Sequence, residues 1–128
     1  MNDTTDTRQQ ILEAAMERIV HYGYSKTTMS EIAKDCNRSA GNIYRFFASK
    51  LDIAEAIGRK FNSELYQTYA SICRKPITAA DRLRQFFEFS MVRTYEALEE
   101  KDKLVELAET LADERPLFMN EKLAQERV

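Results

Sequence analysis

Residues 30–50 read SEIAKDCNRSAGNIYRFFASK, and this stretch decides the fold. It contains two short segments of helical character that are separated by a polar turn at residues 37–39. Asn37 stands where the chain must turn, and asparagine accepts a positive φ more readily than most residues. Ser39 opens the second segment and has the side chain of a helix N-cap. The stretch therefore predicts two short helices joined by a three-residue turn.

A longer helix is expected before this stretch. Apolar residues recur in steps of three and four over residues 11–20, which predicts an amphipathic helix. Asp6 could cap this helix, and Gly23 would end it because glycine adopts the left-handed conformation at low cost. Thr28, followed three residues later by Glu31, is a capping-box pattern that marks the start of the next helix.

Further helices are expected after the stretch. Ser49 marks the start of a long fourth helix, and Thr78 marks the start of a fifth. A shorter helix is expected over residues 104–111, and residues 117–128 are helical in composition. With three glycines, two prolines and no alternating pattern of strands, the chain is predicted to be all-α.

The charges of the chain are unevenly distributed. The formal net charge is −2, but residues 25–50 carry five basic side chains against two acidic ones. Residues 96–115 carry eight acidic side chains against three basic ones. This asymmetry indicates that one face of the protein suits a polyanion and that another does not.

Other features of the sequence exclude several classes of protein. The only histidine is His21, and no clustered acid, base, nucleophile or metal-ligand set occurs, so we predict no enzyme, no catalytic residue, no metal site and no cofactor. Cys36 and Cys73 show neither metal-binding nor redox spacing, and a reduced, cytoplasmic setting fits them. The polar N-terminus and the lack of an apolar run of about 20 residues predict no signal peptide and no membrane span.

The predicted helices have the layout of a helix-turn-helix domain, in which a preceding amphipathic helix braces two short helices. Small residues at the start of the second short helix would let its backbone approach base edges, where Ser39 and Asn42 could form hydrogen bonds. Ile43 and Phe47 lie one turn apart and would anchor this helix, whereas the Tyr44 hydroxyl could contact the DNA backbone. The second short helix is therefore a candidate recognition helix that would bind in the major groove of DNA.

At these residues the sequence resembles the N-terminal domain of TetR-type transcriptional regulators. The resemblance spans residues 6–55 and rests on the order and spacing of Thr7-Arg8, Ile11, Ala14-Ala15, Gly23-Tyr24, Thr27-Thr28, Ile32-Ala33, Ser39, Gly41, Ile43-Tyr44, Phe47 and Lys50. It implies a regulator, usually a repressor, that binds a palindromic operator in double-stranded DNA as a two-fold homodimer. It also implies a helical C-terminal domain that binds a small-molecule effector and controls the spacing of the two DNA-binding domains.

The resemblance also implies roles for individual residues. Thr28, Tyr44 and Lys50 are similar to phosphate contacts of the family. The residues similar to its groove-facing set are Ser39, Ala40, Asn42 and Arg45. With Arg38, these residues make up the predicted DNA-binding site.

Three positions depart from the family pattern. Asn37 replaces the usual turn glycine, and its tolerance of positive φ makes this acceptable. Arg38 stands where a small apolar residue commonly packs, so it is expected to point to solvent or to a phosphate. Phe46 occupies a commonly polar or histidine position, which puts one contact with the DNA backbone in doubt.

Residues 1–50 are thus expected to form the DNA-binding domain, and residues 51–128 a helical regulatory domain for effector binding and dimerisation. Phe86, Phe87 and Tyr95 could line an effector pocket, although an aromatic run at helical spacing is also typical of a core.

The family's chains usually run well beyond 128 residues. The regulatory domain is therefore expected to be incomplete, and this chain to be mostly monomeric or weakly dimeric. The alternative hypothesis is a helical protein-interaction module that does not bind DNA.

Overall fold

The computed structural model of the chain describes residues 3–99 and 101–116. Within these ranges it contains the helices α1 (Asp3–Tyr22), α2 (Met29–Asp35), α3 (Ala40–Phe46), α4 (Lys50–Arg74), α5 (Ala79–Glu99) and α6 (Lys101–Glu114). The described part of the chain contains no strand, and the all-α prediction is confirmed. The helical segment predicted over residues 117–128 lies outside the described residues.

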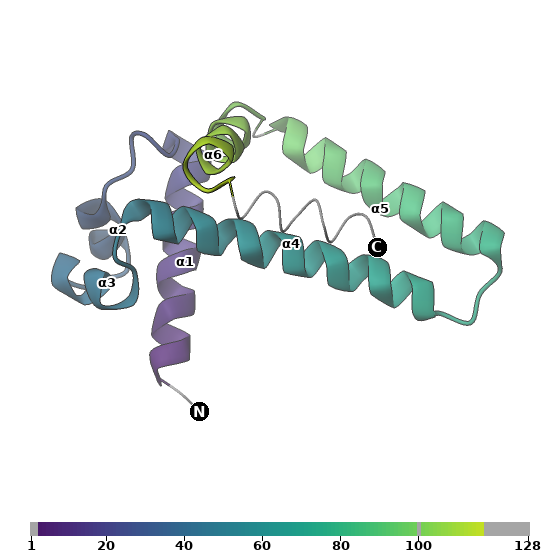
Figure 1. Cartoon of the computed structure of the whole chain (residues 1–128), viewed down its shortest axis with the longest axis horizontal. Coiled ribbons are helices and arrows are strands. Elements are labelled where there is room, and N and C mark those ends of the chain that lie inside the picture. The colour runs from purple at the N-terminus through teal and green to yellow at the C-terminus, as the bar shows by residue number, and fades with distance from the viewer. Residues whose placement is uncertain (1–2, 100, 117–128) are drawn as a thin grey trace.

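The short helices lie at one end of an elongated molecule (Figure 1). There α2 and α3 pack on each other, and α1 packs on α2 and on the first part of α4. Helix α4 extends away from this end, and α5 returns antiparallel to it after a short loop. Helix α6 then contacts both α1 and α4. The chain thus comes back from the far end of the hairpin to the end that carries α2 and α3.

Local hydrogen bonds set the predicted helix starts. The Thr28 hydroxyl accepts from the backbone N–H of Glu31 at 3.2 Å, and the Glu31 carboxylate accepts from the N–H of Thr28 at 3.1 Å, which completes the capping box. Ser39, Ser49 and Thr78 each accept from the backbone N–H three residues later, at 3.1, 3.2 and 3.1 Å. These four predicted starts are confirmed.

The predicted turn residues adopt left-handed backbone. Gly23 has a φ of 97° and Asn37 a φ of 58°, so both predictions are confirmed. The predicted cap of α1 is wrong, because α1 begins at Asp3 and Asp6 lies in its first turn. An acidic side chain in a first turn is still favoured, because it faces the positive end of the helix dipole.

One hydrophobic core holds the short helices in place. Ile43 and Phe47 are 0% and 4% exposed and contribute to it as predicted, together with buried residues of α1, α2 and α4. Leu107 and Leu111 of α6 belong to the same cluster and are 6% and 4% exposed. The core therefore continues across the expected domain boundary at residue 50.

Polar contacts also attach α6 to the end of the molecule that carries α2 and α3. The backbone N–H of Ser25, in the loop between α1 and α2, donates to the Glu106 carboxylate at 2.7 Å. Directly after α6, the Arg115 guanidinium contacts Asp52 at 2.7 Å and Glu55 at 3.3 Å, both in the first turns of α4. Helix α6 is thus joined to two separate segments that flank α2 and α3 in the sequence.

The Glu106 contact predicts a pH dependence of stability. Hydrogen bonds from the backbone and then the side chain of Ser25 hold the pKa of the Glu106 carboxyl below its usual range. Because the pKa is lower in the folded state, the contact stabilises the fold above the unfolded pKa of about 4.3, and this stabilisation is lost as the pH falls through the folded value. The free-energy difference between wild type and Glu106→Gln should therefore be larger at pH 7 than at pH 3.

Urea unfolding of both proteins at several pH values measures this difference. Glu109→Gln, an exposed position on the same helix, is the matched control for the loss of one negative charge. A difference between wild type and Glu106→Gln that grows on acidification would contradict the prediction.

Candidate nucleic-acid interface

Helix α3 is amphipathic, with one face in the core and the other in solvent. Ile43 is fully buried, whereas Ser39, Gly41, Tyr44 and Arg45 are exposed. The exposed face begins at the Ser39 cap, and Gly41 leaves the backbone accessible there because a Cβ at this position would have only the Ser39 Oγ at 4.0 Å. This face can approach a flat or grooved surface closely.

Two side chains of the exposed face are available for a partner. Tyr44 is 52% exposed, and its hydroxyl has no hydrogen-bond partner within residues 3–99 and 101–116. Arg45 is exposed, and its guanidinium forms no ion pair with any residue in these ranges. A neutral donor and a cation next to each other on an open helix face suit phosphate oxygens.

The turn before α3 forms a shallow hollow with α2. Its volume is about 570 Å³, and it is lined by Ser30, Ala33, Lys34, Asn37, Arg38, Ser39 and Ala40. Three of the predicted DNA-binding residues therefore share this surface. The hollow combines hydroxyl, amide and basic groups, which are the side chains that hydrogen-bond to nucleic acids.

Arg38 does not point to solvent as expected. Its guanidinium donates to Asn42 Oδ1 at 3.3 Å, to Gln10 Oε1 at 3.1 Å and to Thr7 Oγ1 at 3.4 Å. The expectation of a side chain directed to solvent was wrong because α1 crosses beside the turn and offers the last two of these acceptors, whereas a phosphate contact stays a prediction. Gln10 was not found from the sequence, since its contact with Arg38 joins residues 28 positions apart and depends on how the helices cross.

Lys50 is also bound within the protein. Its ammonium donates to the backbone carbonyl of Tyr24 at 3.0 Å and lies 4.2 Å from the centre of the Tyr24 ring. A lysine carries three donors, so two N–H groups remain for another acceptor. Thr28 is exposed at the start of α2, and its hydroxyl oxygen already accepts the capping-box hydrogen bond from the N–H of Glu31.

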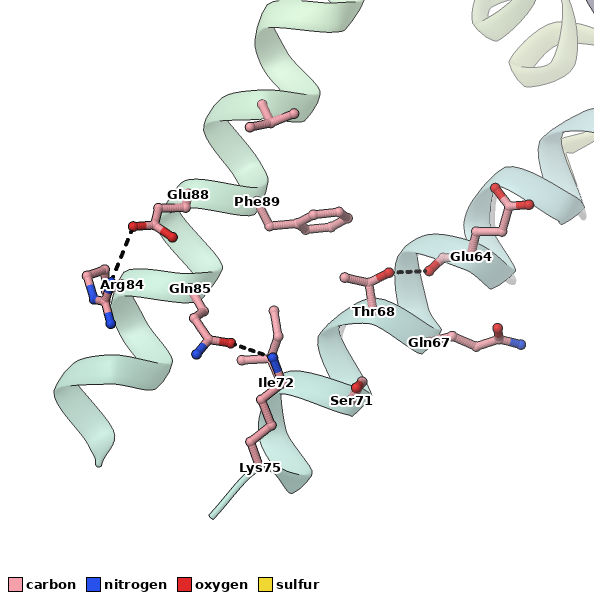
Figure 2. A pocket seen from close by; sticks show the side chains of 11 residues that line it. Glu64, Gln67, Thr68, Ser71, Ile72, Lys75, Arg84, Gln85, Glu88 and Phe89 are labelled. Atoms are coloured by element: carbon pink, nitrogen blue, oxygen red, sulfur yellow. Dashed lines mark hydrogen bonds and ion pairs between the residues drawn. The ribbon is translucent and has the colours of Figure 1, made fainter. Parts of the chain in front are cut away.

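A separate groove of about 780 Å³ lies between α4 and α5, near the loop that joins them (Figure 2). The Phe89 ring points into the space between the two helices. Lys75 donates to Gln85 at 2.9 Å across the groove, and the Arg84 and Glu88 side chains form an ion pair at 3.6 Å on α5. The groove is thus open, and its lining combines these polar side chains with the apolar Ile72, Phe89 and Val92.

The structure does not bring Phe86, Phe87 and Tyr95 into this groove. Phe86 packs edge-on against Tyr69, with ring centres 5.5 Å apart. Phe87 and Tyr95 are 65% and 66% exposed. Consecutive residues on a helix point about 100° apart, which agrees with the packed position of Phe86 and the exposed position of Phe87.

The described residues offer neither a metal site nor a membrane span. No group of three or more His, Cys, Asp or Glu side chains in residues 3–99 and 101–116 could hold a metal ion. In the same part of the chain, no helix is both long and apolar enough to cross a membrane.

Three packed helices with an exposed, serine-capped third helix after a tight turn define a helix-turn-helix DNA-binding domain. Residues 11–57 match the family model described as bacterial regulatory proteins, tetR family. The N-terminal part of the chain is therefore a TetR-family domain.

Individual proteins show the same similarity. The chain is 43% identical over 51 residues to the HTH-type transcriptional regulator YvkB of Bacillus subtilis, a match that covers 40% of this chain and 27% of that protein. A transcriptional regulator from Cytophaga hutchinsonii superposes with a TM-score of 0.70 at 25% identity, and the match covers 93% of this chain and 58% of that one. The TetR-family transcriptional repressor FadR of Thermus thermophilus, in complex with lauroyl-CoA, superposes with a TM-score of 0.63 at 24% identity, covering 92% and 59%. The chain thus spans less than two thirds of these proteins.

Proposed function

We propose that this chain is a sequence-specific DNA-binding transcriptional regulator of the repressor type. The observation that carries the proposal is the open face of α3, where Gly41, Tyr44 and Arg45 lie beside the Ser39 cap. An α-helix presented in this way fits the major groove of B-DNA, in which all four base pairs are distinguishable. The predicted contacts remain Thr28, Arg38, Ser39, Ala40, Asn42, Tyr44, Arg45 and Lys50.

The regulatory half of the proposal rests on the helices that follow residue 50. We propose that a small molecule bound on the α4–α5 side of the full-length protein releases it from a palindromic operator, which the protein binds as a homodimer. The fold of the Thermus thermophilus protein, which was solved with lauroyl-CoA, supports a ligand-controlled arrangement. We further propose a cytoplasmic setting and no enzymatic activity, based on the cysteine usage and on the single histidine.

Selection of binding sites from a random duplex pool tests the function. We expect enrichment of a sequence with two-fold symmetry, and an affinity that falls steeply with salt because phosphates dominate the binding energy. Enrichment of no sequence, together with capture of a protein partner that ignores DNA, would favour the interaction module instead.

Tyr44→Phe is expected to weaken binding to every duplex by about tenfold for each half-site that the protein occupies. The variant loses one hydrogen bond to a charged phosphate oxygen, a loss of about 1.5 kcal/mol, whereas the exposed ring remains. Fluorescence anisotropy with the selected site and with single-base variants measures the affinities. Tyr66→Phe, which removes a hydroxyl from an exposed tyrosine on α4, is the matched control and should bind as wild type does. A loss confined to one base-pair position would show that Tyr44 contacts a base.

A further inference from the structure

The Arg38 guanidinium connects three elements of the DNA-binding end. Arg38 lies in the turn between α2 and α3, and its guanidinium contacts Thr7 and Gln10 of α1 and Asn42 in the first turn of α3. Its Nε is buried and has no acceptor within the described ranges. A buried donor without an acceptor is destabilising, whereas the other nitrogens of this guanidinium form the three contacts above.

The chemistry of arginine decides how the Asn42 amide is oriented. Every N–H group of a guanidinium is a donor, and none can accept. The Asn42 atom that faces Arg38 must therefore be the carbonyl oxygen, and the NH₂ group must occupy the other position of the amide. Asn42 is half-buried, so its amide is not free to rotate as a fully exposed one would be.

An amide held in this way presents its donors to a partner. Asparagine recognises adenine when its oxygen accepts from N6 while its NH₂ donates to N7, which requires both ends of the amide. Guanine has two acceptors, O6 and N7, on the same edge. The Asn42 oxygen keeps a second lone pair, but it faces Arg38, so the NH₂ group is the end of the amide left to turn toward a base. An NH₂ donor alone matches guanine, with its two acceptors, better than adenine.

We propose that Arg38 is a positioning residue that gives Asn42 a preference for guanine over adenine at one base pair of each half-site. The inference rests on the proposed DNA-binding function, and it concerns the choice of base at that site. Arg38 acts on this choice through the amide of Asn42 and through its own anchorage to Thr7 and Gln10.

The experiment compares Arg38→Met with wild type on four duplexes. These duplexes carry the selected site with G, A, C or T at the position where Asn42→Ala relaxes the preference. Wild type should bind the G duplex at least about fivefold more tightly than the A duplex, and Arg38→Met should reduce this ratio to about one or below, because the freed amide can pair with adenine at both ends. The loss of a positive charge weakens binding to all four duplexes alike, so it cancels in the ratio.

A double-mutant cycle separates positioning from a general structural effect. In the Asn42→Ala background, Arg38→Met should leave the G-to-A ratio unchanged, because no amide remains to be oriented. Arg38→Lys keeps the charge and a donor but lacks the planar fork that holds α1 and Asn42 together, so its ratio should lie between those of wild type and Arg38→Met. If circular dichroism shows that Arg38→Met does not fold, the G-to-A ratio of Arg38→Lys tests the inference in its place.

The possible failures are distinguishable. A wild-type protein that binds no duplex, or all duplexes alike, overturns the proposed function itself. A wild type that prefers adenine at this position overturns the inference alone. Specific binding with the same G-to-A ratio in Arg38→Met and Arg38→Lys as in wild type also overturns it.

Discussion

Leu107→Ala is expected to lower the free energy of unfolding by about 2–5 kcal/mol, the range for truncation of a buried leucine. Leu107 lies on α6 and is 6% exposed within the core that also contains Ile43 and Phe47. Removal of its side chain leaves a cavity that the surrounding helices fill only in part. We therefore expect this substitution far from α3 in the sequence to reduce the fraction of folded DNA-binding domain.

Urea unfolding followed by circular dichroism measures the change, and titration with the selected duplex measures its effect on binding. Val105→Ala is the matched control, because Val105 lies on the same helix and is 45% exposed. Its effect should stay within about 0.5 kcal/mol, as for most surface substitutions. Equal effects of the two substitutions would mean that α6 does not belong to the core.

Gly23→Ala is expected to destabilise the protein by about 2–3 kcal/mol. Its left-handed backbone, with φ at 97°, costs an alanine about 1–2 kcal/mol. The added Cβ would also lie 2.9 Å from Glu106 Oε2, so the carboxylate must move. Its hydrogen bond with the Ser25 N–H, now 2.7 Å long, would be lost at a further cost of about 1 kcal/mol.

Gly41→Ala is the matched control for this substitution. Gly41 lies inside α3 without a positive φ, and the added methyl group would meet only the Ser39 Oγ, at 4.0 Å. We expect a gain of about 0.5–1 kcal/mol, the usual advantage of alanine over glycine in a helix. The same variant should bind the selected duplex more weakly, because the new methyl group lies on the face proposed to approach the bases. Thermal unfolding and anisotropy separate the two effects, and destabilisation by Gly41→Ala would contradict the exposure of this face.

The helix starts and turns could be predicted because each depends on residues within one turn of the chain. A hydroxyl three residues before a free N–H, as at Ser39 or Thr28, predicts a helix start without any knowledge of the rest of the fold. The same holds for Asn37, whose short polar side chain tolerates a positive φ, and for Gly23, which has no Cβ. The start of α1 was missed because Asp6 is acceptable both as a cap and inside a first turn.

The contacts of the candidate site could be predicted less well because they join distant segments. The sequence shows that Arg38 is polar, but only the crossing of α1 beside the turn brings Thr7 and Gln10 to it. Similarly, the spacing of Phe87 and Tyr95 on α5 does not show whether another element covers them. The roles of individual residues in DNA binding remain predictions that the variants above address.

Because α6 packs against the end of the molecule that carries α2 and α3, it affects how DNA-binding domains can be exchanged between regulators. A hybrid that joined residues 1–50 to the body of another protein would lack the leucines of α6 and the acceptor for the Ser25 N–H. Its helix-turn-helix would then have an open hydrophobic side next to α1. A graft that keeps the specificity of this protein should therefore carry the first turns of α4 and residues 101–115 with it, although residues 101–115 contribute nothing to the proposed contact with DNA. In this molecule the smallest transferable unit is discontinuous in sequence.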